Sequence, residues 1–159
     1  MTALHQIAPP FVQTAHRIVW ATVATVDPDQ RPRSRVLHPI WEWDGDALTG
    51  WIGTGPTPLK RRHLEHSPFV SVNYWDQRHD IATAECRATW HLDDDTCRRI
   101  WDLYVAAPEP LGYDPSIIPA WNAPSDPSFA VLRLDPWRLR VFPAAALLGE
   151  AQPLDWRAD

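Results

Sequence analysis

Apolar and polar residues alternate through the middle of the chain, and this period of two predicts β-strands. Within residues 69–75, Val70, Val72 and Tyr74 share one face, and the polar residues between them share the other. Residues 81–90 alternate in the same way, with small residues on one face and polar or charged residues opposite. Such alternation is typical of a strand that buries one face. We therefore expect two strands in this part of the chain.

Segments on either side of this pair carry the signals of further strands. Five of them combine β-branched or alternating residues with turn residues at their ends: residues 18–26, 33–43, 47–53, 129–134 and 137–142. Asp44-Gly45-Asp46 is a strong hairpin signal between the second and the third. Asp135-Pro136 separates the last two, and the residues after them are expected to form a C-terminal tail.

Helical spacing marks two segments, and strands outnumber them. Residues 3–17 predict a short helix that is interrupted by Pro9-Pro10. A second helix starts near three aspartates, and Asp93 or Asp94 is its expected cap. Its apolar stripe, which we expect to be buried, consists of Cys97, Ile100, Trp101 and Tyr104. Residues 107–127 follow as a proline-rich loop. Together the elements predict a mainly β fold, an antiparallel barrel of six or seven strands with peripheral helices and Greek-key connections.

Length, charge and cysteine content narrow the class of protein. The 159 residues, 45% of them hydrophobic, suit one domain over residues 1–159, with a core over about 16–142 and a tail over 143–159. The net charge of −5 gives no electrostatic footprint for nucleic acid. No signal peptide and no membrane-spanning apolar run of about 20 residues is visible. Cys86 and Cys97 form no C-x-x-C pair, so we expect a cytoplasmic protein with reduced thiols.

Familiar catalytic motifs are missing from the sequence. There is no dinucleotide-binding glycine fingerprint, no phosphate-binding P-loop and no nucleophile elbow. His63 and His66 are three residues apart on a predicted helix and could touch one metal ion. No third ligand is evident, so we expect both on a solvated face and predict no metal site. No catalytic side chain is assigned, and any redox chemistry would belong to a bound cofactor.

A short helix with a basic first turn predicts a phosphate site. Thr57 is a good N-cap, and Pro58 stands at the first helical position. Lys60 lies in the first turn, where the helix dipole disfavours a cation, but a bound phosphate would reverse that effect. The helix has few apolar positions, so packing does not explain it. Arg35 on a predicted strand and the Thr54 hydroxyl before the helix complete the expected anion site.

Three stretches of the chain, in this order, resemble the flavin-binding split-barrel superfamily. They are QRPRSRVLHPIWEW, TGPTPLKRRHLEHSPFVSVNYW and ATAECRATW, and the resemblance covers about residues 16–142. This is the pyridoxamine-phosphate-oxidase-like group, which includes general-stress flavoproteins and flavin/deazaflavin reductases. The resemblance implies an antiparallel split barrel that binds FMN.

The resemblance also implies which residues contact the cofactor. Its phosphate-binding lysine corresponds to Lys60 and its strand arginine to Arg35. Pro58 stands where the family usually has a serine, and Ile81 stands where the oxidases have a glutamine. Trp51 is a candidate flavin or interface contact, as are Trp75 and Trp137. The complete set of expected cofactor-binding residues is Arg35, Val36, Leu37, His38, Trp51, Thr54, Thr57 and Lys60.

The function that this resemblance implies is that of an FMN-dependent oxidoreductase. Hydride would pass through the flavin to a small-molecule substrate that the sequence does not identify. Members of the superfamily are typically homodimers with flavin between the subunits, so we expect a homodimer. One alternative is a reductase that uses a deazaflavin (coenzyme factor 420), whose polyglutamate tail calls for a more basic groove than the net charge of −5 indicates. Another is a non-catalytic flavin-binding or sensor protein.

Overall fold

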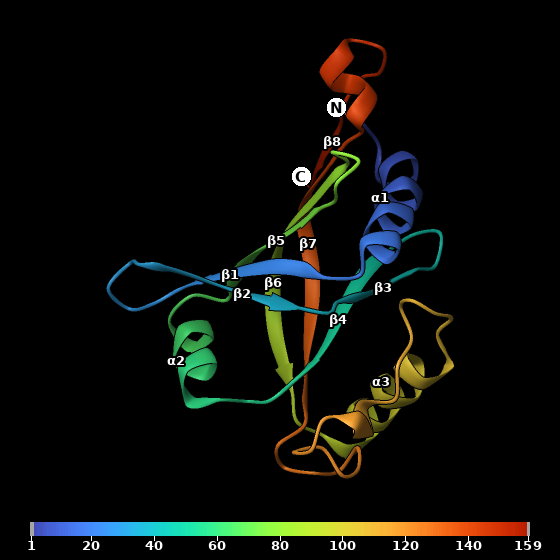
Figure 1. Ribbon diagram of the computed structural model, residues 1–159. Coiled ribbons are helices and arrows are strands. Elements are labelled where there is room, and N and C mark those ends of the chain that lie inside the picture. The colour runs from blue at the N-terminus through green and yellow to red at the C-terminus, as the bar shows by residue number, and fades with distance from the viewer. Residues whose placement is uncertain (1, 159) are drawn as a thin grey trace.

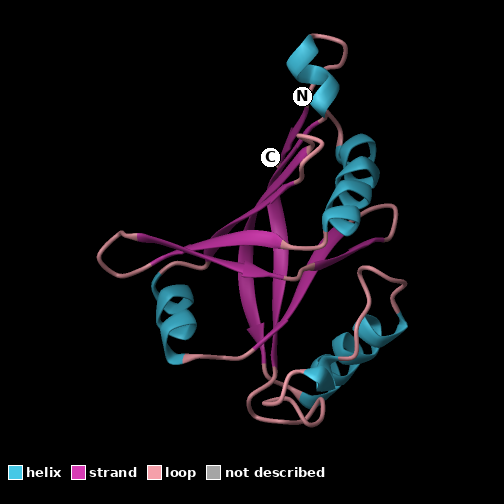
Figure 2. Ribbon diagram, in the orientation of Figure 1, coloured by secondary structure: helices cyan, strands magenta, loops and turns pink. Residues whose placement is uncertain are grey.

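Eight antiparallel strands in one sheet, with three helices around it, make up the computed structural model, which describes residues 2–158 (Figures 1 and 2). The strands are β1 (Ala21–Val26), β2 (Pro32–Leu37), β3 (Ile40–Trp43), β4 (Leu48–Thr54), β5 (Phe69–Trp75), β6 (Ile81–His91), β7 (Ala130–Phe142) and β8 (Leu154–Arg157). The helices are α1 (Leu4–Ile18), α2 (Pro58–His66) and α3 (Asp94–Ala106), with short 3-10 helices η1 (Pro115–Ile117) and η2 (Ala144–Leu148). Within residues 2–158, no helix is long and apolar enough to cross a membrane.

The sheet curls but does not close. Its strands follow the order β2-β1-β5-β6-β7-β4-β3, and β8 adds to β7 outside this path. The expected mainly β, antiparallel architecture with peripheral helices is confirmed. The number of strands is eight instead of six or seven, and β2 and β3 form the two ends of the sheet.

Several of the predicted strand boundaries are wrong, two of them at prolines. The expected strand over 33–43 splits into β2 and β3 at His38-Pro39, because proline lacks the N–H that a ladder needs. Asp135-Pro136 does not end a strand, however. A register shift opposite Glu85/Cys86 absorbs it, so β7 runs on to Phe142. The expected tail contains β8, which pairs with residues 138–141 of β7.

Helix α1 runs through both of its prolines, contrary to the expected interruption. Pro9 and Pro10 lie inside a continuous helix of 15 residues. Ile7 and Phe11 on its inner face are fully buried in the main core of the sheet. Such tertiary packing outweighs the hydrogen bonds that the two prolines remove. Because the helix extends to Ile18, the first strand begins only at Ala21.

Two hydrophobic clusters fill the interior. The main one lies between the curled sheet and α1, where Gly50 leaves room for the ring of Trp41 and Trp41 Nε1 donates a hydrogen bond to the Tyr74 hydroxyl at 2.8 Å. The second lies under α3, whose predicted stripe is buried as expected. Asp93 caps this helix, as expected, by accepting a hydrogen bond from the Thr96 backbone N–H at 2.8 Å.

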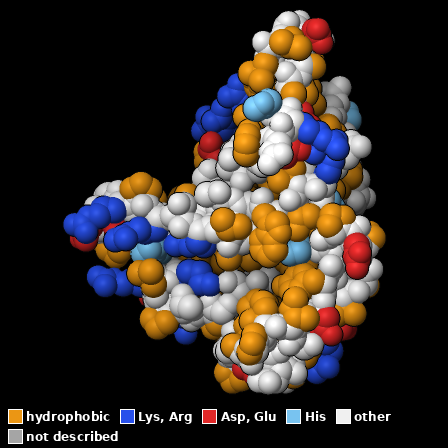
Figure 3. Space-filling view, in the orientation of Figure 1, with side chains coloured by type: hydrophobic (Ala, Val, Ile, Leu, Met, Phe, Trp, Pro, Cys, Tyr) orange, Lys and Arg blue, Asp and Glu red, His pale blue; other side chains and the backbone are white. Residues whose placement is uncertain are grey.

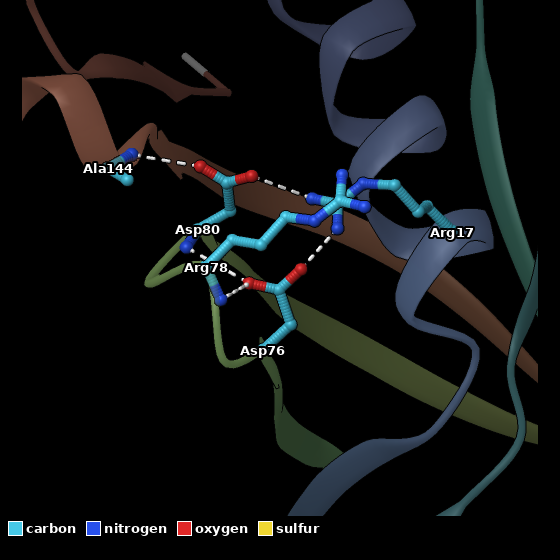
Figure 4. Close-up of polar contacts among 5 residues, drawn as sticks. All are labelled: Arg17, Asp76, Arg78, Asp80 and Ala144. Carbon is cyan, nitrogen blue, oxygen red and sulfur yellow. Dashed lines mark hydrogen bonds and ion pairs between the residues drawn. The ribbon is translucent and has the colours of Figure 1, made fainter.

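A cluster of paired charges fixes the end of α1 to the sheet (Figure 4). Arg17 forms ion pairs with Asp76 and with Asp80, the second at 2.8 Å. Asp76 also accepts the backbone N–H of Arg78, and Asp80 accepts that of Ala144 at the start of η2, each at 2.9 Å. The helix, the β5–β6 turn and η2 therefore meet at one arginine with two carboxylate partners. We call this group the Arg17 cluster.

Candidate functional site

Arg35 and Lys60 form a second group of cations, which we call the Arg35–Lys60 pair. Arg35 projects from β2 and donates a hydrogen bond from Nη1 to Thr25 Oγ1 at 2.8 Å. Lys60 projects from the first turn of α2 and donates from Nζ to Thr54 Oγ1 at 2.5 Å. Among residues 2–158, no carboxylate lies within 4.0 Å of either charge. The fold thus brings three of the expected phosphate-site residues together without a counter-ion.

The electrostatics of the Arg35–Lys60 pair favour an anion. Partial burial and, as the second cause, the nearby charge of Arg35 together lower the pKa of Lys60 to about 8. Burial also lowers the pKa of Arg35. Two cations that are partly desolvated and repel each other are costly in the free protein. A phosphate between them would relieve both costs.

Thr25 and His63 support Arg35, and the sequence analysis missed this role for both. Because Arg35 donates to Thr25 Oγ1, the threonine hydrogen is free to donate to His63 Nδ1, which lies 2.9 Å away. His63 is 1% exposed, so the expected solvated face is wrong for this residue. His66 is exposed as expected and contacts Gln30. The spacing of three residues between Lys60 and His63 on α2 was the available signal, because such residues share a helix face.

An aromatic cavity adjoins the Arg35–Lys60 pair. Its volume is about 340 Å³, and its walls come from the α1–β1 junction, the ends of β2 and β4, and the loop after α3. The residues in its walls are Val19, Trp20, Val36, Leu37, His38, Gly53, Thr54, Pro110, Tyr113, Ile117, Ile118 and Trp121. No Asp, Glu, Lys or Arg of the described chain is among them. Thr54 lines the cavity and also accepts the hydrogen bond from Lys60, so the cavity and the cation pair are neighbours.

Among residues 2–158, His38 and Thr54 are the two buried polar side chains in the cavity wall. His38 is 8% exposed, and its ring stacks on Tyr113 with centroids 5.1 Å apart at 26°. The Trp20 ring lies at 5.1 Å on another side. Burial is the main cause that lowers the pKa of His38, so the ring is neutral at pH 7. His38 Nε2 is buried and has no hydrogen-bond partner among residues 2–158.

Other expected residues lie at the margins of the site. Thr57 precedes α2 and is exposed, and its side chain caps no backbone N–H of the described residues. Its hydroxyl is therefore free to face a ligand at the start of the helix. Val36 is 62% exposed at the rim of the cavity, and Leu37 is half-buried in its wall.

The tryptophans expected near a flavin lie apart from the cation pair. Trp51 is buried under α3, where its Nε1 donates to Glu42 at 2.7 Å and the Arg99 guanidinium lies 4.6 Å from its ring. It does not line the cavity. Trp75 is 54% exposed at the end of β5, and Trp137 lies on β7. The loop aromatics Tyr113 and Trp121 line the cavity instead, and no sequence motif marked them.

Solved structures share this arrangement of strands and helices. A protein related to general stress protein 26, of the pyridoxinephosphate oxidase family, from Clostridium acetobutylicum superposes with a TM-score of 0.69 at 11% identity, over 97% of this chain and 94% of that one. General stress protein 26 from Bacillus anthracis gives 0.67 at 16% identity, over 98% and 99%. A pyridoxamine 5′-phosphate oxidase-related, FMN-binding protein from Nostoc punctiforme gives 0.65 at 15%, over 100% and 98%. The chain has their split-barrel fold. No family model and no curated protein sequence matches it.

The residues of this split barrel fit FMN. A phosphate needs cations and hydroxyl donors, and Arg35, Lys60 and Thr54 supply them with no competing carboxylate in the described part of the chain. A flat, uncharged ring system needs an apolar and aromatic slot, and the cavity supplies one. Both parts meet at Thr54, as the two ends of a single ligand require.

Proposed function

We propose that the protein binds FMN and works as an oxidoreductase on a small-molecule substrate. One observation carries this proposal: Arg35 and Lys60, two cations without a counter-ion among the described residues, adjoin an aromatic cavity through Thr54. Charge-assisted hydrogen bonds to a phosphate are among the strong contacts that proteins make. The split-barrel fold, shared with an FMN-binding protein, supports the same cofactor.

Each part of the site has a separate task in this proposal. Arg35 and Lys60 hold the phosphate, and Thr54 and Thr57 offer hydroxyls to it. Thr25 and His63 keep the Arg35 guanidinium in place through two hydrogen bonds. The cavity holds the ring and excludes water from it. When bound, FMN supplies hydride transfer, so no side chain of the protein needs to act covalently.

We further propose that the working form is a homodimer with the cavity at the interface. The rim of the cavity exposes large apolar side chains: Trp20 is 60% exposed, Val36 62% and Ile117 70%. Exposed apolar residues gathered around one opening are typical of a covered surface. Sedimentation at micromolar concentration tests this, and a single species of 18.2 kDa would overturn it.

Absorption spectroscopy with two ligands tests the proposed cofactor. We expect the protein to bind FMN at one per chain, with the shifted visible bands of an enclosed flavin. Riboflavin, which lacks the phosphate, should bind at least about tenfold more weakly, because each charge-assisted contact contributes about 1.5–3 kcal/mol. Equal affinities for FMN and riboflavin would contradict the proposed phosphate site. Bleaching of the bound flavin by a nicotinamide donor, and recovery with an electron acceptor, would distinguish a catalyst from a flavin carrier.

A deazaflavin with a polyglutamate tail is the second candidate cofactor. A local group of basic side chains, which could bind the acidic tail, favours it. Basic side chains gather around the β1–β2 hairpin and α2, at the left of Figure 3, although the whole chain is acidic. Arg31 and Arg33 each lie near an aspartate, at 3.6 Å and 3.5 Å. Arg61 and Arg62 are exposed and have no ion pair within residues 2–158. A deazaflavin spectrum in the purified protein would favour this candidate over FMN.

A further inference from the structure

One buried nitrogen in the cavity wall, His38 Nε2, has no partner among residues 2–158. Buried polar atoms are nearly always hydrogen-bonded, because leaving one unpaired is costly. Aromatic and aliphatic side chains make up most of the wall around it. The ring itself is held in place by stacking on Tyr113 and by contact with Trp20. The fold therefore fixes the orientation of a polar group that it does not satisfy.

This nitrogen acts as an acceptor. Burial lowers the pKa of the His38 ring, and a hydrogen bond between the ring and the Leu111 backbone partly opposes this shift, as donation from a ring N–H to a carbonyl does. Because Nε2 has no partner, the donor is Nδ1, and in a neutral imidazole the other nitrogen then carries a lone pair. The titratable groups around the ring are His16, Tyr104 and Tyr113. Of these, the Tyr104 hydroxyl already donates to the backbone carbonyl of His38.

We propose that His38 Nε2 accepts a hydrogen bond from the ring N–H of the bound flavin and so sets the orientation of the ring. This inference rests on the proposed function. An oxidised flavin ring carries a single N–H, at N3 of its pyrimidine part. The pyrimidine edge therefore faces His38, and the dimethylbenzene edge points away from it. A 5-deazaflavin carries the same N3–H, so His38 serves either candidate cofactor.

Methylation of the ligand at N3 tests the contact directly. The parent protein should bind 3-methylriboflavin about tenfold more weakly than riboflavin, because one hydrogen bond to a buried acceptor is lost. Riboflavin is used as the reference so that the phosphate site does not contribute. In His38→Phe, the two ligands should bind within about threefold of each other, because no acceptor remains to distinguish them. Tyr113→Phe is the matched control: it alters the same aromatic stack and should keep the tenfold difference.

The outcomes separate this inference from the proposed function. If the parent binds FMN but does not distinguish the two riboflavins, the His38 contact is wrong and the FMN site stands. If His38→Phe still binds 3-methylriboflavin about tenfold more weakly than riboflavin, the contact is also wrong. The size of the methyl group alone would then explain the difference in affinity. His38→Gln keeps an amide oxygen as acceptor and should retain part of the penalty, and it replaces His38→Phe if that variant fails to fold. If the parent binds no flavin, both proposals fall.

Discussion

Two arginines in this molecule are in opposite electrostatic surroundings. Arg17 lies between Asp76 and Asp80, and all three charges are satisfied within the fold (Figure 4). Arg35 has a lysine and a threonine beside it and forms no ion pair with a carboxylate of residues 2–158. The chain has 20 acidic residues against 15 Lys and Arg, so a shortage of carboxylates does not explain the difference. An arginine with two carboxylates holds the fold together, whereas one that repels its neighbour has the surroundings that a proposed anion site requires.

The largest expected effect follows from removing both cations of the Arg35–Lys60 pair. Each contact to a phosphate contributes about 1.5–3 kcal/mol, or about tenfold to a hundredfold in affinity. Arg35→Ala combined with Lys60→Ala should therefore weaken FMN binding at least a hundredfold and leave riboflavin binding unchanged. Fluorescence titration measures both. Arg17→Ala is the control, and an equal loss of FMN affinity in that variant would erase the contrast between the two arginines.

A pH titration should distinguish Lys60 from the arginines. The pKa of Lys60 in the free protein is about 8, and a bound phosphate would raise it. Above pH 8, FMN binding must therefore take up a proton, and the affinity should fall by up to about tenfold per pH unit. Binding of riboflavin should stay flat over the same range. Lys60→Arg keeps its charge throughout and should abolish the pH dependence. If the FMN affinity of Lys60→Arg still fell steeply with pH, a group other than Lys60 would cause the pH dependence.

Removing the hydrogen bonds that hold Arg35 in place should have a smaller effect on FMN affinity. Thr25→Val keeps the shape of the side chain but removes the hydroxyl that joins Arg35 to His63. FMN affinity should fall about three- to tenfold, because the guanidinium is still present but less well oriented. Thr25→Ser restores the hydroxyl and should restore the affinity. If Thr25→Ser binds FMN as weakly as Thr25→Val does, the affinity depends on packing at this position and not on the hydrogen bond.

Removing the charge of Lys60 and removing that of Arg17 should change the thermal stability of the protein in opposite directions. Lys60 has a lowered pKa, so its charged form destabilises the folded protein at pH 7, and this cost disappears as the pH rises above the ordinary lysine pKa. In the absence of ligand, Lys60→Met should raise the melting temperature by roughly 2–4 °C, the effect of about 1 kcal/mol after solvent screening of a half-exposed group. Arg17→Met should lower it. Calorimetry without flavin measures both, and destabilisation by Lys60→Met would contradict the assignment.

Local patterns accounted for most of the strands and for α3. The alternation over residues 69–75 reproduces β5 without error, and Asp93 caps α3 as its position predicts. These features depend on neighbours in the sequence, so the sequence contains their cause. The correct juxtaposition of Arg35, Thr54 and Lys60 came from the family resemblance together with the dipole argument at α2.

The features of the fold and of the site that the sequence did not predict depend on contacts between distant segments. Thr25 and His63 are 38 residues apart, and only the docking of α2 on β1 makes them partners. The proline pair in α1 is tolerated because Phe11 is buried in a core that strands from all parts of the chain create. The loop aromatic Tyr113 reaches the cavity after a segment with no periodicity at all. A single sequence gives no local signal for such pairings.

Strand β7 gives the chain a particular order of assembly. It pairs with β6 through residues 131–142 and with β4 through residues 130–134. Before these residues leave the ribosome, the sheet consists of two unconnected pieces, β2-β1-β5-β6 and β4-β3. Arg35 and Thr25 belong to the first piece, and Thr54 belongs to the second. Because long-range pairing of this kind forms late, the nascent chain brings the residues of the proposed anion site together only when most of its length has been synthesised.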